Sequence, residues 1–318
     1  MTSDIKRIFR TAWELVARLG QKKLPFIIAD DQTRRSWARA VKSYDSVPEN
    51  YKGFFDALPP GERNPFPYTV ITPTFRGFIK PENEKLICNP GGRIYVLERI
   101  GNKLTSTCYP LEDIFYVEAG KILLYSWITI HGVDSNGVPT SSTIKSSLVT
   151  DYLITPVVES IRPATILAKD TDLGTEIAYF DCLGRLNFKF MSYAKKSIRS
   201  GEKVIQTILQ PEIRAEVLKL FDKTFSKSIS TAHLIILTDS ELIIIRDDES
   251  QSWLKGSRHG GIWSYIPLNK VTSVSLTGKD NDLLVLSILL SEKQHLDSLF
   301  QVSMKGELER LVNRFKSY

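Results

Sequence analysis

The chain has 318 residues, of which 42% are hydrophobic and 25% charged, and its formal net charge is +6. This composition excludes a disordered chain, and the length predicts two domains with an appendage. The longest apolar runs, such as residues 122–125 and 283–286, are far shorter than the roughly 20 residues that a membrane-spanning helix requires. We therefore expect a folded, soluble protein.

The N-terminus mixes Lys6, Arg7 and Arg10 with apolar residues and has no continuous apolar signal region, which predicts an unprocessed, cytoplasmic chain. The three cysteines, Cys88, Cys108 and Cys182, are odd in number. An odd count argues against a disulfide framework and is consistent with a reducing compartment. We expect these cysteines to be ordinary core residues.

Residues 1–64 are predicted to form a helical segment and a linker. Apolar residues recur at helical spacing between Asp4 and Leu19, and a second helix is expected at residues 32–41. Up to Tyr44 there are ten basic residues against four acidic ones, so this segment carries the whole charge excess. Its aromatic residues Phe9 and Trp13 are candidate binding residues. The first helix could pack on a module, lie on an anionic membrane or mediate self-association.

From residue 65 to residue 163 the period is that of strands. Short runs of β-branched and aromatic residues alternate with turn sequences such as Asn89-Pro90-Gly91-Gly92. Strands at such close spacing indicate antiparallel sheets. We expect strands at residues 68–72, 85–88, 93–98, 104–109, 114–117, 122–130 and 142–148, and then a helix at residues 150–162.

Residues 164–318 are predicted to repeat this order. A hairpin is expected from residues 176–180 and 187–191, followed by a strand at 203–209 and a helix at 213–221. Further strands are expected at residues 233–237, 242–246, 262–266, 271–276, 283–289 and 299–304. A final helix at residues 307–316 carries Leu308, Leu311, Val312 and Phe315 on one side, and this stripe must pack onto the preceding strands.

The two halves contain an internal repeat. The segment from Pro110 to Val117 aligns without gaps on Pro267 to Val274, and Arg93 to Glu98 corresponds to Glu241 to Arg246. In each half a further apolar strand, another strand and a helix follow. The shared order of elements is stronger evidence of a repeat than the short identity.

The run Leu237 to Ile245, the Ile-Pro-Leu-x-x-Val segment at Ile266 to Val271, and the terminal amphipathic helix together resemble bacterial pleckstrin-homology-like (PH-like) domains. The resemblance covers residues 203–318 and, less closely, residues 68–162. It implies a mainly β (α+β) fold, with two antiparallel PH-like sandwiches or barrels, each closed by a C-terminal helix. The modules are expected at residues 65–163 and 164–318, after the N-terminal helical segment.

No pattern of residues predicts catalysis. The four histidines, His131, His233, His259 and His295, have no second ligand at metal spacing, and the pairs Asp30-Asp31 and Asp247-Asp248 lie in expected turns. A nucleophile elbow, a P-loop and a dinucleotide fingerprint are missing from the sequence. We expect a protein that is not an enzyme and that uses neither a metal nor another cofactor.

Two further candidate binding surfaces lie in the second half. One is the loop with Trp253, Lys255, Arg258 and His259, and the other is the basic cluster Lys195, Lys196 and Arg199. We expect a scaffolding protein that presents PH-like modules to a protein partner. The alternative is a peripheral protein on the inner, anionic face of the membrane, and self-association is left open. Nucleic acid is disfavoured, because the modules are formally neutral and lack an aromatic and basic strand face.

Overall fold

The computed structural model of the chain describes residues 37–59, 62, 65–66, 68–76, 81–122, 125–163, 172–220, 223–247, 260–279, 282–291 and 294–315. Within these residues the protein is mainly β, with antiparallel sheets and a helix after the last strand. None of the helices described in these ranges is long and apolar enough to cross a membrane. The predicted first helix and the predicted loop at Trp253 to His259 lie outside the described residues.

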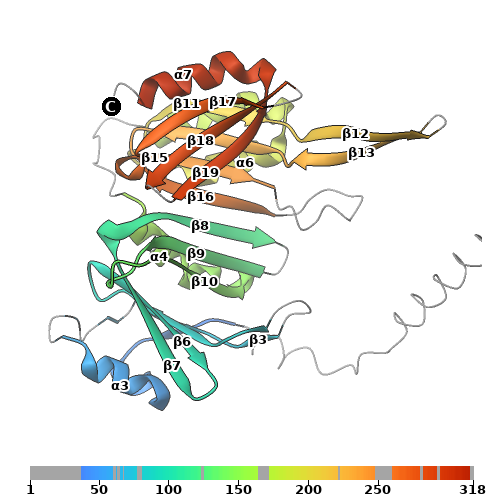
Figure 1. Cartoon of the computed structure of the whole chain (residues 1–318). Helices are drawn as coiled ribbons and strands as arrows, with labels where there is room; N and C mark the ends of the chain where they lie inside the picture. Colours follow the sequence, from blue (N-terminus) through green and yellow to red (C-terminus); the bar gives the residue numbers. More distant parts are fainter. Residues whose placement is uncertain are drawn as a thin grey trace, which may run out of the picture.

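The first half forms two packed layers of strands (Figure 1). One sheet has the order β1-β2-β5-β6-β7, and the other layer is formed by β8, β9 and β10. The short pair β3-β4 connects β2 to β5. The strands are β1 (Arg39–Val41), β2 (Thr69–Thr72), β3 (Phe75–Arg76), β4 (Pro81–Glu82), β5 (Lys85–Cys88), β6 (Arg93–Ile100), β7 (Lys103–Pro110), β8 (Ile114–Ile122), β9 (Tyr125–Val133) and β10 (Pro139–Ser147).

Helices cover both sides of this first half. Between its layers, the 3-10 turn η4 (Leu148–Leu153) leads into α4 (Thr155–Ile161), which buries Val157, Val158 and Ile161 against the strands. On the outer face, α3 (Glu49–Ala57) buries Tyr51 and Phe55 in a second cluster with β2, β5 and β6. Strand β5 is therefore buried on both faces, and its run of apolar residues follows from that.

The second half repeats this order of elements. Strands β11, β14, β15 and β16 form one layer, β17, β18 and β19 form the other, and α7 closes the end. Their bounds are β11 (Val204–Gln210), β14 (His233–Thr238), β15 (Glu241–Arg246), β16 (Gly261–Pro267), β17 (Ser273–Lys279), β18 (Leu283–Ser291), β19 (Gln294–Gln301) and α7 (Lys305–Phe315). The predicted stripe is confirmed, because Leu308, Leu311 and Val312 are buried in this core.

The two halves also repeat the register of their strands. In the first half Leu86 pairs with Leu97, and in the second Leu234 pairs with Ile245, each residue lying 148 positions further along the chain. These equivalent residues also lie in equivalent places, since both pairs belong to the cluster on the outer face of their sheet. These residues of the two halves therefore share the same strand pairing and the same place in their sheets.

Strands β8 and β16 join the halves. Strand β8 of the first half pairs antiparallel with β16 of the second, with Lys121 opposite Gly261 and Val117 opposite Tyr265. The result is one seven-stranded sheet in the order β10-β9-β8-β16-β15-β14-β11 (Figure 1). The halves thus share a continuous hydrogen-bonded sheet at their boundary.

The predicted hairpin at residues 176–191 is wrong. These residues form α5 (Leu173–Ala178), the 3-10 segment η5 (Tyr179–Arg185) and α6 (Phe188–Ser197). Asp172 and Asn187 cap the two helices by accepting hydrogen bonds from the backbone N–H groups of the first turn. Phe190 and Ala194 of α6 are fully buried over the outer face of β14 and β15. The apolar spacing that resembled strand alternation is the buried side of this helix.

The predicted helix at residues 213–221 is also wrong. Strand β12 (Ile213–Leu220) pairs with β13 (Lys223–Ser230), which the sequence analysis missed, and together they extend from the body as a ribbon (Figure 1). An antiparallel partner only two residues further on overrides the helical propensity of β12.

Three other segments differ from the prediction. Residues 39–41, expected in the second helix, form strand β1, which pairs with β2. The expected strand at residues 122–130 spans the end of β8 and most of β9, and residues 302–304 form the 3-10 turn η8 after β19. Two further 3-10 turns, η3 (Leu111–Asp113) and η7 (Leu268–Lys270), occupy equivalent positions in the two halves.

Candidate binding site beside helix α4

Helix α4 separates two hollows on the described surface. Its apolar side is buried in the first core, while Glu159 on its exposed side contributes to the walls of both hollows. One hollow lies within the first half, and the other lies where the two halves meet. The site is therefore best described from this short helix outward.

The hollow within the first half is an aromatic groove of about 730 Å³. Turn η4 and α4 form one wall, and the start of β2 with the β5–β6 turn forms the other. Tyr68 and Tyr152 are 56% and 70% exposed, so both rings are open to solvent along this groove. We define the aromatic groove by Phe66, Tyr68, Pro90, Tyr152, Leu153 and Pro156.

The β5–β6 turn that shapes this groove is set by two glycines. Gly91 and Gly92 have φ angles of +108° and +72°, in the region that residues with a Cβ rarely adopt. The side chain of Asn89 accepts a hydrogen bond from the N–H of Gly91 and fixes the turn. The turn places Pro90 on the groove wall.

The aromatic groove is almost free of charge. Glu159 is the single charged side chain among the described residues that line it. Aromatic rings and prolines supply apolar contact area, and the tyrosine hydroxyls supply hydrogen bonds at the rim. Such a surface can bind an apolar, extended segment, and it offers little to a phosphate or a carboxylate.

The second hollow, the junction cavity, has a volume of about 500 Å³ and lies between α4, α6 and the strands β8 and β16. Ala119, Val158 and Trp263 contribute apolar walls, and Lys121 and Lys196 lie among the lining residues. Lys121 forms an ion pair of 2.5 Å with Asp151. The cavity thus combines an apolar interior with a partly neutralised rim.

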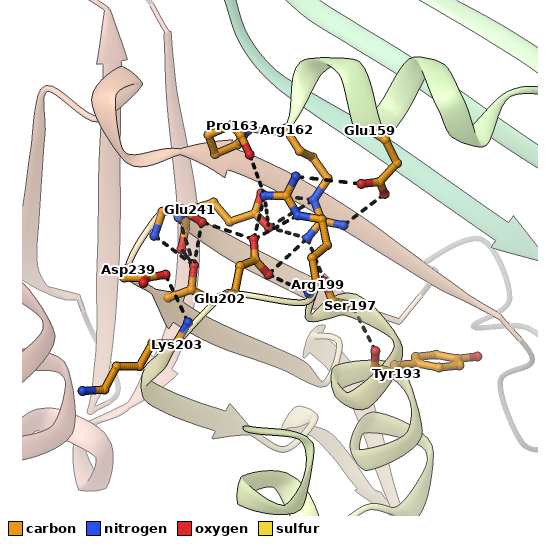
Figure 2. Close-up of polar contacts among 12 residues, drawn as sticks. Glu159, Arg162, Pro163, Tyr193, Ser197, Arg199, Glu202, Lys203, Asp239 and Glu241 are labelled. Carbon is orange, nitrogen blue, oxygen red and sulfur yellow. Dashed lines mark hydrogen bonds and ion pairs between the residues drawn. The ribbon is translucent and has the colours of Figure 1, made fainter. Parts of the chain in front are cut away.

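A buried ion cluster adjoins the junction cavity, because Arg162 belongs both to the cluster and to the cavity lining (Figure 2). Arg162, the residue after α4, donates from Nε to the two carboxylate oxygens of Glu241 at 3.1 and 3.3 Å and from Nη2 to the carbonyl of Ser197 at 2.7 Å. Its guanidinium also lies 4.2 Å from the centre of the Tyr265 ring. The cluster links the first half to β15, β16 and α6 of the second.

Glu202 and Arg199 complete the cluster. Arg199 donates from Nη2 to Glu202 at 2.7 Å and to the carbonyl of Pro163 at 2.8 Å. The hydrogen bonds from Arg199 and the charge of Arg162 hold the pKa of Glu202 below its ordinary value despite its burial. Burial raises the pKa of Glu241 to about 7, although the contact with Arg162 opposes the shift.

The structure places the predicted basic cluster in three different environments. Lys195 is paired with Asp181, Arg199 belongs to the buried ion cluster, and Lys196 lines the junction cavity. They do not form one surface of free cations. The other predicted binding residues, Phe9, Trp13, Trp253, Lys255, Arg258 and His259, lie outside the described residues.

Two histidines of the described part are engaged within the fold. His131 stacks on Tyr116 with ring centres 4.2 Å apart, and His233 donates a hydrogen bond from Nδ1 to the carbonyl of Thr231. Burial lowers the pKa of both imidazoles. Among the described residues no group of three or more His, Cys, Asp or Glu side chains could hold a metal ion.

Sequence reasoning missed the aromatic groove and the Arg162–Glu241 pair. Tyr152 gave a usable signal, because it falls off the stripe of Leu153, Val157 and Ile161 in the helix expected at residues 150–162. A large aromatic residue off the apolar stripe of a helix indicates an exposed ring. Arg162 and Glu241 gave no local signal, since only the tertiary fold brings them together.

No known family model matches this chain, and a comparison with curated proteins finds no significant match. Functional conclusions therefore rest on the geometry beside α4.

Proposed function

We propose that this chain is a non-enzymatic binding protein with two tandem PH-like modules, and that its aromatic groove holds an extended, proline-rich segment of a protein partner. A layer of five strands in the first half, and of four in the second, is followed by a three-stranded layer and a closing helix. This order supports the PH-like resemblance seen in the sequence. The shared seven-stranded sheet would hold the two modules as one scaffold.

The observation that carries the proposal is the exposure of Tyr68 and Tyr152 along one groove. Aromatic side chains are enriched where proteins bind each other, because each ring buries much apolar area at a small cost in side-chain entropy. Grooves lined by aromatic residues bind proline-rich segments, whose extended helix is already formed before binding. The near absence of charge favours an uncharged segment over an acidic one.

The paired state of the basic residues favours a protein partner over an anionic membrane. Lys195 and Arg199 are neutralised by Asp181 and Glu202, so they would have to leave these partners to contact lipid headgroups. Anionic membranes attract clusters of free lysine and arginine side chains. A cytoplasmic scaffold is the role that agrees best with this arrangement.

Selection from a random decapeptide display library tests the proposal. We expect enrichment of proline-rich sequences, and we expect Tyr152→Ala and Tyr68→Ala each to weaken binding of the selected peptide by about tenfold or more. Tyr179→Ala is the matched control, because this tyrosine is 46% exposed but lies outside the groove. Fluorescence anisotropy with the labelled peptide measures all three variants.

Two results would overturn this function. One is a selection that yields no binder, or binders that are as sensitive to Tyr179→Ala as to Tyr152→Ala. The other is binding to phosphatidylserine vesicles that neither groove variant changes, which would assign the protein to the membrane surface.

A further inference from the structure

The two halves offer two equivalent pairs of strand edges, β8 with β16 and β7 with β17, and the junction is formed by the first pair. Because Pro110 aligns with Pro267, β7 corresponds to β16 and β8 corresponds to β17. The junction pairs β8 with β16, whereas their counterparts stand at the ends of their sheets. In the described part of the chain, β7 pairs with β6 alone and β17 with β18 alone.

The exposure of these strands reflects this difference. Strand β16 is buried along nearly its whole length, while most of its counterpart β7 is half-buried or exposed. On the outer edge of β7 the carbonyl of Cys108 accepts a hydrogen bond from the N–H of Ser135 at 2.9 Å. Backbone groups of alternate residues point to the same side of a strand, so Ser106 and Leu104 also direct theirs outward.

We propose that copies of this chain associate head to tail, with β17 of one copy added antiparallel to β7 of the next in the register of the β8–β16 junction. In that junction Ala119 lies opposite Trp263, and a shift of 157 residues, the spacing of Pro110 and Pro267, places Leu276 opposite Ser106. The partner is a second copy because the chain already contains one instance of this contact.

The facing segments are suited to strand pairing. Beyond the Cys108 carbonyl, which Ser135 occupies, residues 104–107 and 275–278 contain no proline and no charged residue, the two devices that most often protect a free strand edge. Their Thr side chains favour extended structure. The same register brings Lys103 opposite Lys279 at one end, and both lysines are exposed. Like charges directly opposite each other oppose pairing, so the association is weak and strengthens with added salt.

The contact between copies also lacks the ion pair of the junction. The counterpart of Glu241 is Arg93, which lies 3.9 Å from Glu62 of its own half. Association is therefore weaker than the covalently linked junction and depends on protein concentration.

The proposed contact is heterologous, because it joins different surfaces of the two copies. Figure 1 shows β7 near one end of the molecule and β17 beside α7 near the other. A contact of this kind either closes into a ring or continues as a filament.

Charge reversal tests both the surface and the register. At low ionic strength, sedimentation velocity of the full chain should show tighter association for Lys103→Glu and for Lys279→Glu, each by about fivefold. The double variant restores like charges and should return to the wild-type value. Lys227→Glu on β13 is the control for a change in net charge, and it should leave association unchanged.

A backbone block completes the test. Ser106→Pro removes an outward N–H, and in the Lys279→Glu background it should abolish association while thermal unfolding shows that the fold persists. The proposal would be overturned if all four lysine variants, which are Lys103→Glu, Lys279→Glu, their combination and Lys227→Glu, stayed monomeric at the highest attainable protein concentration. Association that persists in the folded proline variant would also overturn it, as would a double variant that associates more tightly than either single variant.

Discussion

Arg162 at the end of α4 and Glu241 on β15 form a buried pair across the boundary between the two halves. The guanidinium Nε contacts the carboxylate oxygens at 3.1 and 3.3 Å, although the residues are 79 positions apart in the chain. Their exposed fractions are 5% and 0%. The pair fixes the helix beside which both hollows lie, so its removal should affect stability and binding together.

Replacement of Arg162 should destabilise the protein in a pH-dependent way. Arg162→Met removes the hydrogen-bonded cation of the buried Glu241 and leaves only Arg199, 3.9 Å away, which costs about 3–5 kcal/mol of unfolding free energy. The pKa of Glu241 is raised to about 7 from an ordinary 4.5 and rises further without Arg162. Because the pKa of Glu241 is raised in the folded state, its contribution to the free energy of unfolding is complete below the unfolded pKa. This contribution is lost as the pH rises through the folded pKa. Urea unfolding should therefore show a larger deficit at pH 8 than near pH 5.

Arg214→Met is the matched control for this variant. The Arg214 side chain is 61% exposed and pairs with Glu212 at 2.9 Å, and exposed pairs contribute only about 0–1 kcal/mol. An equal loss for the two variants, or a deficit for Arg162→Met that grows as the pH falls, would contradict the assigned role of the cluster.

His233 should make the fold less stable in acid. Burial holds its pKa below the ordinary 6.5, so the unfolded chain binds the proton more readily. The contribution of His233 is present above the unfolded pKa and is lost as the pH falls from about 6.5 through the lowered value. His233→Gln removes the titrating group and should flatten the pH dependence between neutral and mildly acidic solution. Urea unfolding of the wild type and of His233→Gln across this pH range measures the difference, and an unchanged slope in the variant would contradict the assigned role of His233.

Gly260 should tolerate no side chain. Its φ is +104°, and a Cβ at this position would lie 2.1 Å from the carbonyl oxygen of Lys121 on β8. Gly260→Ala should cost about 1–3 kcal/mol, because the strained backbone and the edge of β8 must both shift. Gly53→Ala in helix α3 meets nothing within 4 Å and should be neutral or stabilising. Thermal unfolding of the two variants compares them, and a neutral Gly260→Ala would place β8 further from β16 than described.

The shared sheet should make the two halves unfold together. Ile94 and Leu242 occupy equivalent positions and are both 0% exposed. Each replacement by alanine should cost about 2–5 kcal/mol and shift one common transition. Urea unfolding followed by both far-UV circular dichroism and tryptophan fluorescence distinguishes the cases. Two separated transitions, with each variant moving only its own, would show that the β8–β16 junction does not couple the halves.

Residue patterns predicted the strands better than the segments inserted among them. Strands such as β14 and β15 are buried on both faces, and their unbroken runs of Ile and Leu are plain in the sequence. Helix α7 was predicted because its buried residues recur at i, i+3 and i+4. Segments α6 and β12 were mistaken because their apolar spacing fits two periods, and only their tertiary neighbours select one.

The candidate site was beyond local patterns for a related reason. Tyr68 and Tyr152 lie 84 residues apart, and neither sits in a recognisable motif. The groove exists because α4 closes the first core next to the β5–β6 turn. The sequence repeat does not predict how closely α4 and this turn approach each other. Charge patterns pointed to Lys195 and Arg199, but the structure pairs Lys195 with Asp181 in η5 and Arg199 with Glu202 three residues further along the chain.

The most direct test of the binding account is amide hydrogen exchange of the full chain with and without a peptide selected from the library. We predict slower exchange at Gly91 and Gly92 in the β5–β6 turn and at Leu153 beside Tyr152, with β18 unchanged. The Tyr152→Ala variant should lose this protection at the same peptide concentration. Protection confined to the junction cavity around Lys196, or no change in the groove, would contradict the assignment of the aromatic groove as the binding surface.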